Sequence, residues 1–374
     1  MDPGRENIMR ISRWRLFLRR YLPAAICLVF LAGCQIPQAS LYQKLSDSSV
    51  AIFTGGRLNG TGWFAAREGL IVTAAHVVWG RKGSLEVVSD RFGRLPAKRI
   101  AVDRGSDLAL LRVAPRDGGY PALELASAPP EEGEEVFLYG TALFRRRLLL
   151  PGRVARAAYR YEYMLESCLR MWYVAGPSPG GTSGGCWVNR HGRVVGNQSA
   201  CMTLEKSHLG VAHLSTLDDI RRLVTTRTSR TRPFMGCALE EMHERSEEYI
   251  ARFPPGTRGL VPVCLLKDGP AEKAGLGEWT LITSLDGKLF TDRTAFMDHL
   301  WATRRPGEEI ILGIQRLEQI KPPSTAPAAA GPASTKPGAS RPAATKPATA
   351  PAVKYELVPA QVRLKLVSQD EETQ

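Results

Sequence analysis

The segment GPSPGGTSGG, residues 176–185, holds five glycines and two prolines, and Ser183 stands in it directly before a glycine pair. Clusters of Gly, Pro and Ser mark turns far more often than active sites, so this segment alone indicates a surface loop. The alternative is that Ser183 is a nucleophile on a strained turn. That interpretation requires a base elsewhere in the chain.

The surrounding sequence has an all-β texture from residue 48 to residue 215. Short apolar runs such as SVAIFTG (49–55), GLIVTAAHVV (69–78) and LALLRV (108–113) are separated by turn residues. This regular spacing predicts a β-sandwich or barrel. A helix is expected next, in STLDDIRRLV, where Ser215 and Asp218 have the spacing of a capping box.

Two residues of this β-rich half provide partners for Ser183. His76 ends one apolar strand and Asp107 precedes another. A serine hydroxyl attacks a carbonyl only when an imidazole takes its proton, and a carboxylate fixes that imidazole. We therefore predict that Ser183 is the nucleophile, His76 the general base and acid, and Asp107 the orienting group. The N–H groups of Gly181 and Ser183 would form the oxyanion hole, which a β-carbon at position 181 would obstruct.

Four motifs carry a family resemblance: GTGWF, GLIVTAAHVV, SDLALLRV and GGTSGGCWVNRHGRVVG. Together they resemble the trypsin-like serine proteases, specifically the HtrA (Deg) family, over about residues 48–224. The resemblance implies a chymotrypsin-like double β-barrel with the triad between the barrels, and unfolded or damaged proteins as substrates. It also implies that the strand with Asn197, Gln198 and Ser199 binds an extended substrate, and it suggests a homotrimer.

The second half contains RPFMGCALEEM (232–242) and GLVPVCLLKDGPAEKAGL (259–276), which resemble a circularly permuted PDZ domain. The fold class expected for the whole chain is thus mainly β, with a PDZ-like α+β domain after the barrels. Such a domain captures peptide C-termini on backbone N–H groups. By resemblance, the loop that receives the carboxylate consists of Phe234, Met235, Gly236 and Cys237. The alternative is a small α+β domain without a ligand.

The N-terminus has the pattern of an export signal. Several arginines precede the apolar run LPAAICLVFLAG (22–33), which is too short to span a bilayer, and Cys34 follows. The sequence LAGC resembles the lipobox of bacterial lipoproteins. We expect cleavage before Cys34, lipidation of Cys34, and a protein anchored to a bacterial membrane that faces the periplasm or the cell exterior. The alternatives are an uncleaved membrane anchor and a buried leading helix.

The stretch from residue 321 to residue 352 consists largely of Pro, Ala, Ser, Thr and spaced Lys, which cannot build a core. Apolar alternation resumes afterwards in QVRLKLV (361–367). We interpret the later segment as the last PDZ strand, which makes the Pro/Ala-rich stretch a long insertion. The alternative is an unattached tail that crosses the cell wall.

The predicted domain organisation is a signal peptide (1–33), an N-terminal tether (34–47), a protease domain (48–226), a linker (227–232), a PDZ-like domain (233–318), a disordered insertion (319–353), a final PDZ strand (354–367) and a tail (368–374).

Composition restricts the partners. The chain has 374 residues, of which 44% are hydrophobic and 23% charged, as in ordinary globular proteins, and a net charge of +13. No basic block beyond residues 145–147 and no recognition motif accompanies that charge, so we expect no nucleic-acid partner. Without a CxxC pair or an HExxH motif we expect no metal and no cofactor. The cysteines expected to stay free of lipid leave room for one disulfide in each half, with open connectivity: Cys168, Cys186, Cys201, Cys237 and Cys264.

Two classes of function follow from these patterns. The first is a membrane-tethered serine endopeptidase with a peptide-binding domain. The second is a catalytically quiet chaperone or scaffold that binds unfolded chains or C-terminal peptides. Loss of function on replacing Ser183 would distinguish them.

Overall fold

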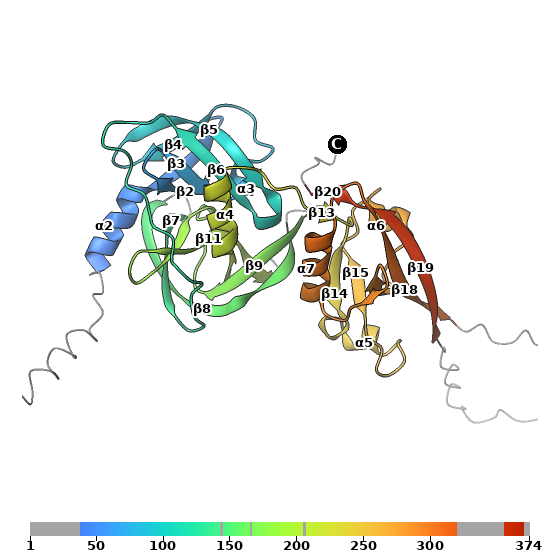
Figure 1. Cartoon of the computed structure of the whole chain (residues 1–374). Coiled ribbons are helices and arrows are strands. Elements are labelled where there is room, and N and C mark those ends of the chain that lie inside the picture. The colour runs from blue at the N-terminus through green and yellow to red at the C-terminus, as the bar shows by residue number, and fades with distance from the viewer. Residues whose placement is uncertain (1–37, 143–144, 165–166, 205–206, 320–354, 370–374) are drawn as a thin grey trace, which may run out of the picture. The chain divides into compact units, whose positions relative to one another are not determined.

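The computed structural model describes residues 38–142, 145–164, 167–204, 207–319 and 355–369 (Figure 1). The first unit runs to Arg160 and continues with Arg170–Arg230, and the second combines Tyr161–Leu169 with the chain from Thr231 onward. The predicted signal peptide, Cys34 and most of the Pro/Ala-rich insertion lie outside the described residues. None of the helices within those ranges is long and apolar enough to cross a membrane.

The first unit contains two closed antiparallel barrels. The first barrel has the strand order β1 (Ser49–Thr54), β2 (Arg57–Ala66), β3 (Leu70–Thr73), β6 (Leu108–Val113), β5 (Gly93–Asp103), β4 (Leu85–Ser89). The second has the order β10 (Cys186–Asn189), β11 (Val194–Leu204), β12 (Ser207–Ser215), β9 (Ser167–Ala175), β8 (Arg145–Met164), β7 (Glu135–Ala142). The prediction of a mainly β, double-barrel fold is confirmed.

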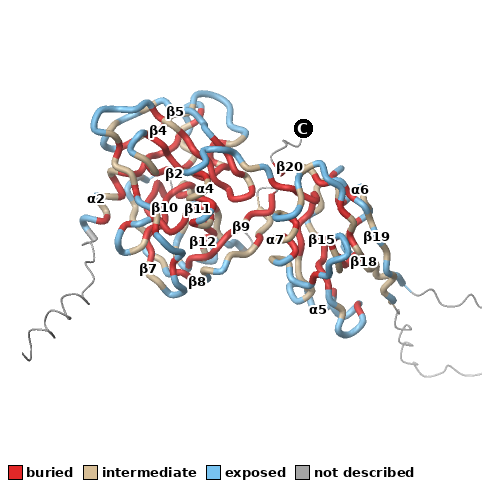
Figure 2. The backbone as a smooth tube through the Cα atoms, in the orientation of Figure 1, coloured by how far each residue is buried: buried red, intermediate tan, exposed pale blue. Residues whose placement is uncertain are grey.

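Buried residues run along the strands of both barrels (Figure 2). Phe64 and Ile71 lie in the first barrel, and Trp172 and Trp187 lie in the second. A further cluster joins both barrels to helices α2 (Gln38–Ser48) and α4 (Leu217–Thr226). Closure of the strands into barrels leaves no open sheet edge among the described strands of this unit. Burial of apolar side chains is the main favourable term in its folding.

Helix α4 begins one residue later than the sequence predicts. The hydroxyl of Thr216 accepts the N–H of Asp219, so Thr216 is the N-cap. Ser215 is instead the last residue of β12 and is buried. The expected capping box of Ser215 and Asp218 is therefore wrong, because a barrel strand extends through the position that the motif assigned to the cap.

The second unit is built on one sheet, whose strands differ in length, and on helices. Its strand order is β14 (Ala238–Glu241), β15 (Leu260–Val263), β16 (Thr280–Leu285), β18 (Glu309–Gln319), β19 (Tyr355–Lys365), and β17 (Lys288–Leu289) pairs with β16. A separate pair joins β13 (Pro233–Phe234) to β20 (Val367–Ser368). The helices are α5 (Glu247–Ile250), α6 (Pro270–Lys273) and α7 (Arg293–Thr303).

Strands β18 and β19 pair antiparallel along their whole length, from Glu309 opposite Lys365 to Gln319 opposite Tyr355. The chain therefore leaves the sheet after β18 and returns to the neighbouring position with β19. Leu364 and Leu366 are buried after this return. Strand β19 and the residue that follows it thus add the last strand of the sheet and part of its buried core.

The tip of the β8–β9 hairpin belongs to the second unit. Tyr161 donates to the Asp298 carboxylate of α7 over 2.8 Å, and its ring meets the Trp301 ring at 4.7 Å between centroids. Cys168 lies close to the Cys237 carbonyl, with 3.8 Å between sulfur and oxygen. One strand pair thereby contributes residues to both units.

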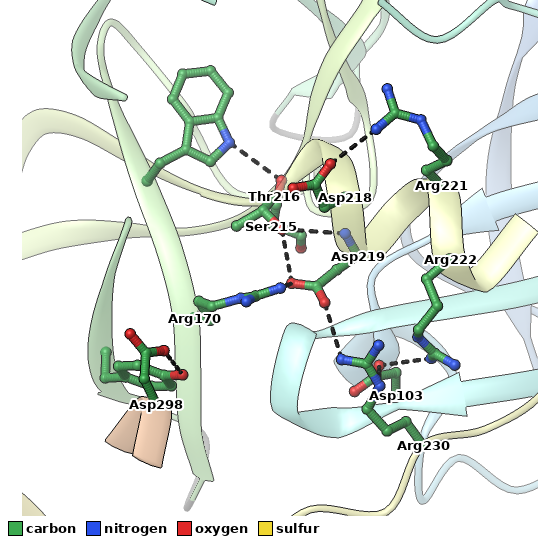
Figure 3. Close-up of polar contacts among 12 residues, drawn as sticks. Asp103, Arg170, Ser215, Thr216, Asp218, Asp219, Arg221, Arg222, Arg230 and Asp298 are labelled. Atoms are coloured by element: carbon green, nitrogen blue, oxygen red, sulfur yellow. Dashed lines mark hydrogen bonds and ion pairs between the residues drawn. The ribbon is translucent and has the colours of Figure 1, made fainter. Parts of the chain in front are cut away.

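The predicted linker is fixed to the first unit by a buried charge cluster (Figure 3). Arg230 lies 3.3 Å from Asp219, which also accepts from Arg170 at 2.8 Å. Asp103 accepts from Arg222 at 2.8 Å, and the carboxylates of Asp103 and Asp219 are at most 1% exposed. Burial lowers the pKa of Arg230, and Asp103 opposes that change. Since buried carboxylates need partners, Arg230 joins the predicted linker to this cluster.

Candidate active site

His76 and Asp107 are brought together by two irregular segments of the first barrel. His76 lies on the short helix α3 (Ala75–Val78) directly after β3, and Asp107 follows a 3-10 turn with φ of 49°. The Nδ1 atom of His76 is 2.8 Å from Oδ2 of Asp107, and the backbone N–H of His76 donates to Oδ1 over 3.0 Å. The carboxylate, only 2% exposed, assigns the proton to Nδ1 and leaves Nε2 free to act as a base.

Two opposing effects act on the pKa of His76. Burial lowers it, whereas the charge of Asp107 and the hydrogen bond to that carboxylate raise it. The net result is a pKa above the usual 6.5. A base of this strength is matched to proton transfer near neutral pH.

The loop that carries Ser183 depends on its glycines. Gly181 and Gly184 have φ of 94° and 82°, which residues with a side chain rarely adopt. A β-carbon on Gly184 would collide with the Thr61 carbonyl and the Thr73 hydroxyl. The loop is also joined to β11, because the N–H of Gly184 donates to the Gln198 carbonyl over 2.7 Å.

Thr61 of β2 holds the same loop from the first barrel. Its N–H donates to the Ser183 carbonyl over 2.8 Å, and its hydroxyl donates to the Gly181 carbonyl over 2.9 Å. That hydroxyl also accepts the N–H of Thr141 over 3.0 Å. Sequence reasoning placed Thr61 in the GTGWF motif but gave it no role, since the bonds cross 120 residues of chain.

Ser199 connects Ser183 to the other two residues. The hydroxyl of Ser183 donates to the Ser199 carbonyl over 3.3 Å, and the hydroxyl of Ser199 donates to Asp107 over 2.5 Å. Among the described residues, Ser183 has no hydrogen bond to His76. All three predicted residues therefore lie in one network, with the Ser183 hydroxyl turned toward Ser199.

The backbone N–H groups of Gly181 and Ser183 were predicted to form the oxyanion hole. Within the described ranges, neither N–H donates to a protein group. An oxyanion site needs donors without protein acceptors, and the assignment of these two groups to it stays a prediction.

The side chains of Asn197 and Gln198 have partners inside the protein, and the predicted substrate contact of their strand stays a prediction. Asn197 is fully buried and accepts the indole N–H of Trp63 over 3.1 Å. Gln198 is 2% exposed and accepts the indole N–H of Trp187 over 2.8 Å. Both side chains point into the protein, because the large indoles of the barrel cores need polar partners. Ser199 likewise directs its hydroxyl inward, to Asp107.

Of the four residues of the predicted carboxylate loop, Phe234 ends β13, and the other three lie between β13 and β14. Gly236 has φ of 80°, and the other three are at most 4% exposed. The carbonyls of Met235 and Gly236 accept the N–H groups of Ala271 and Leu266. In the described part of the chain, the N–H groups of Met235, Gly236 and Cys237 donate to no protein group. Successive N–H groups without a protein acceptor are the kind of donor set that can bind an anion.

The cysteines form no disulfide in this structure: Cys168, Cys186, Cys201, Cys237 and Cys264 are all free thiols. These five cysteines therefore do not form the disulfide that the sequence allows in each half. In the ranges that the structure describes, no three His, Cys, Asp or Glu side chains come together as a metal site.

Comparison with known proteins gives one family match and many similar chains. Residues 60–196 match the model of the trypsin-like peptidase domain. The chain is 28% identical to "Serine protease HTRA1" of Xenopus tropicalis over 72% of its own length and 60% of that relative. It is 29% identical to the "Probable periplasmic serine endoprotease DegP-like" of Pseudomonas fulva over 69% of its own length and 53% of that relative. The chain thus spans a little over half the length of these relatives.

Solved structures resemble the fold of most of the chain. The structure of "HtrA-type protease AlgW with tripeptide" superposes with a TM-score of 0.57 at 16% identity, and covers 90% of this chain and 99% of the other. The serine endoprotease from Yersinia pestis gives a TM-score of 0.54 at 14% identity, and covers 89% of this chain and 98% of the other.

Proposed function

We propose that this chain, which is similar to the HtrA family of trypsin-like serine proteases, is a serine endopeptidase that cleaves unfolded or damaged proteins outside the cytoplasm. The single observation that carries the proposal is the network in which Asp107 holds His76 at 2.8 Å and Ser199 joins Asp107 to Ser183. A coupled serine, imidazole and buried carboxylate can perform acyl transfer.

The proposed reaction begins with rotation of the Ser183 hydroxyl from the Ser199 carbonyl to Nε2 of His76. The Ser183 oxygen then attacks the peptide carbonyl while His76 takes the proton. The N–H groups of Gly181 and Ser183 stabilise the resulting oxyanion, an effect that is worth about 3 kcal/mol per donor. His76 next protonates the leaving amine, and water hydrolyses the acyl-enzyme by the same route. Asp107 keeps the imidazole oriented and stabilises its charged form throughout.

A fluorophosphonate probe tests this proposal directly, because it reacts only with an activated serine. We expect labelling of the purified protein at Ser183, and none in the Ser183→Ala or His76→Ala variants. A protein that stays unlabelled, also with added C-terminal peptides, would instead support the scaffold function. The resting contact between Ser183 and Ser199 makes the condition with added peptide necessary.

We further propose that the second unit binds peptide C-termini at Phe234, Met235, Gly236 and Cys237. The free N–H groups of this loop support the proposal, as does β14, which is an edge strand that an extended peptide could extend. The Arg293 guanidinium donates to the Leu239 carbonyl of β14 over 3.0 Å. This hydrogen bond would have to break before a peptide could pair with that carbonyl. Fluorescence anisotropy with a library of free-acid peptides tests binding, and the amidated peptides are the control, because they lack the carboxylate.

Membrane attachment through lipidated Cys34 is also proposed. It is supported by the LAGC motif after an apolar run and by the word "periplasmic" in the name of the Pseudomonas relative. We expect the protein to fractionate with membranes and the Cys34→Ser variant to leave them or to remain unprocessed. Unchanged processing and membrane content in that variant would exclude the lipid anchor.

A further inference from the structure

A cysteine and a histidine meet on the β11–β12 hairpin. The sulfur of Cys201 lies 2.9 Å from Nδ1 of His208, although Cys201 pairs with Ala212 and His208 with Thr203. The strand register shifts between Cys201 and Thr203, and this irregularity accompanies the contact. A thiol and an imidazole at this distance have the arrangement of a nucleophile with its base.

The other described cysteines lack this combination of access and base. Cys168, Cys186 and Cys237 are buried, and burial raises the pKa of Cys168 and Cys186 to about 12. Cys264 is exposed, but within the described ranges no imidazole hydrogen-bonds to it. Cys201 is half-buried, and its neighbour His208 is exposed. Burial raises the pKa of Cys201, and a hydrogen bond from Ser178 opposes the rise.

The position of Cys201 connects it to the Ser183 loop. Cys201 follows Ser199 by two residues, and Ser178 belongs to the segment that leads into Ser183. The same segment is tied to the hairpin, because the N–H of Gly176 donates to the Gly210 carbonyl over 2.8 Å. A group attached to the Cys201 sulfur would therefore lie next to Ser178, in the segment that leads into Ser183.

We propose that Cys201 and His208 form a thiol–disulfide exchange site for small disulfides, and that a mixed disulfide at Cys201 slows acylation of Ser183. The second half of this proposal rests on the proposed endopeptidase function. The first half does not depend on it.

The exchange balances without an outside oxidant. His208 takes the proton from the Cys201 thiol as the sulfur attacks one sulfur of the small disulfide. A new S–S bond to Cys201 forms, the S–S bond of the reagent breaks, and the leaving thiolate receives the proton from His208. One thiol and one disulfide are consumed, and one of each is produced.

The test uses the full chain and the disulfide reagent DTNB, with the rate at each cysteine followed by peptide mass mapping. We expect Cys201 to react roughly tenfold faster than the more exposed Cys264. The His208→Ala variant should reduce the Cys201 rate to that of Cys264 and leave Cys264 unchanged. His191→Ala, which changes an exposed histidine on another turn, is the matched control. Equal rates at both cysteines, or no effect of His208→Ala, would overturn the exchange site.

The link to Ser183 is measured by fluorophosphonate labelling before and after DTNB. We expect labelling to fall roughly fivefold, to recover with dithiothreitol, and not to fall in the Cys201→Ser variant. Unchanged labelling of the modified chain would overturn the link. A reduced protein that never labels would overturn both the link and the endopeptidase function, while the DTNB rates would still decide the exchange site.

Discussion

Ser199 contacts Asp107 through its hydroxyl and Ser183 through its carbonyl, at 2.5 and 3.3 Å. One residue of β11 thus holds the carboxylate that orients His76 and also receives the resting hydroxyl of the nucleophile. The first contact depends on the side chain and the second on the backbone. A substitution can therefore separate them.

Replacing Ser199 by Ala should remove the bond to Asp107 and keep the carbonyl. A hydrogen bond to a charged group contributes about 1.5–3 kcal/mol, so we expect the rate of fluorophosphonate labelling to fall roughly tenfold or more. Ser127→Ala, at an exposed serine of the same unit, is the control and should keep the normal rate. If the Ser199→Ala variant were labelled at the normal rate, the hydrogen bond from Ser199 to Asp107 would not be needed for the reaction of Ser183.

The labelling rate should rise with pH through a midpoint above 6.5, because neutral His76 is the base and its pKa is raised. In Asp107→Asn the charge that raises this pKa is lost while burial remains. The midpoint should therefore move below 6.5, and the rate at its plateau should fall by about 10⁴-fold. A pH series of the labelling rate measures both values.

Labelling should be lost at low pH, but protonation of His76 should not unfold the protein. Its folded-state pKa is raised, so protonation of His76 stabilises the fold below its unfolded-state pKa, and this contribution disappears as pH rises through the folded-state pKa. If the pH midpoint of the labelling rate were the same in the Asp107→Asn variant as in the parent, the assignment of His76 as the titrating group would be contradicted.

Gly184→Ala should destabilise the protein by about 3 kcal/mol, since its β-carbon has no room and its φ is 82°. Gly180→Ala is the matched control on the same loop, because nothing lies within 4 Å of a β-carbon there. That variant should stay within about 0.5 kcal/mol of the parent. Urea denaturation of the two variants measures the free energy of unfolding. Equal losses would mean that the loop adjusts to both side chains.

Asp219→Asn should destabilise the protein by about 3 kcal/mol, because it removes the charge that compensates Arg170 and Arg230 in a buried cluster. The adjacent Asp218 is 73% exposed and pairs with Arg221 on the surface, as Figure 3 shows. Asp218→Asn should therefore cost no more than about 0.5 kcal/mol. Thermal unfolding of the two variants should differ clearly. Similar midpoints would show that the cluster adds nothing to stability.

Sequence reasoning found the parts that local pattern determines. Alternating apolar runs identified the barrel strands, because every second residue of a strand faces the core. The order of His76, Asp107 and Ser183, together with the glycines, led to residues that the structure joins in one network.

It did not find the contacts that depend on distant parts of the chain. In the sequence, Asn197 and Gln198 are polar residues on a strand. Nothing local indicates that their side-chain oxygens accept the indole N–H groups of Trp63 and Trp187. Thr61 has no local signal that it holds Gly181, 120 residues away. The linker predicted over residues 227–232 gave no sign that carboxylates from two other segments would bind Arg230.

The shared β8–β9 hairpin limits how the chain can be divided. A fragment that ends at Arg230 would retain Tyr161 and Cys168 but lose Asp298, Trp301 and the Cys237 carbonyl. Newly uncovered apolar surface of this kind favours association between molecules. Excision of either half at the obvious linker should therefore yield material that aggregates, and only a cut that also shortens the hairpin would give a well-behaved isolated module.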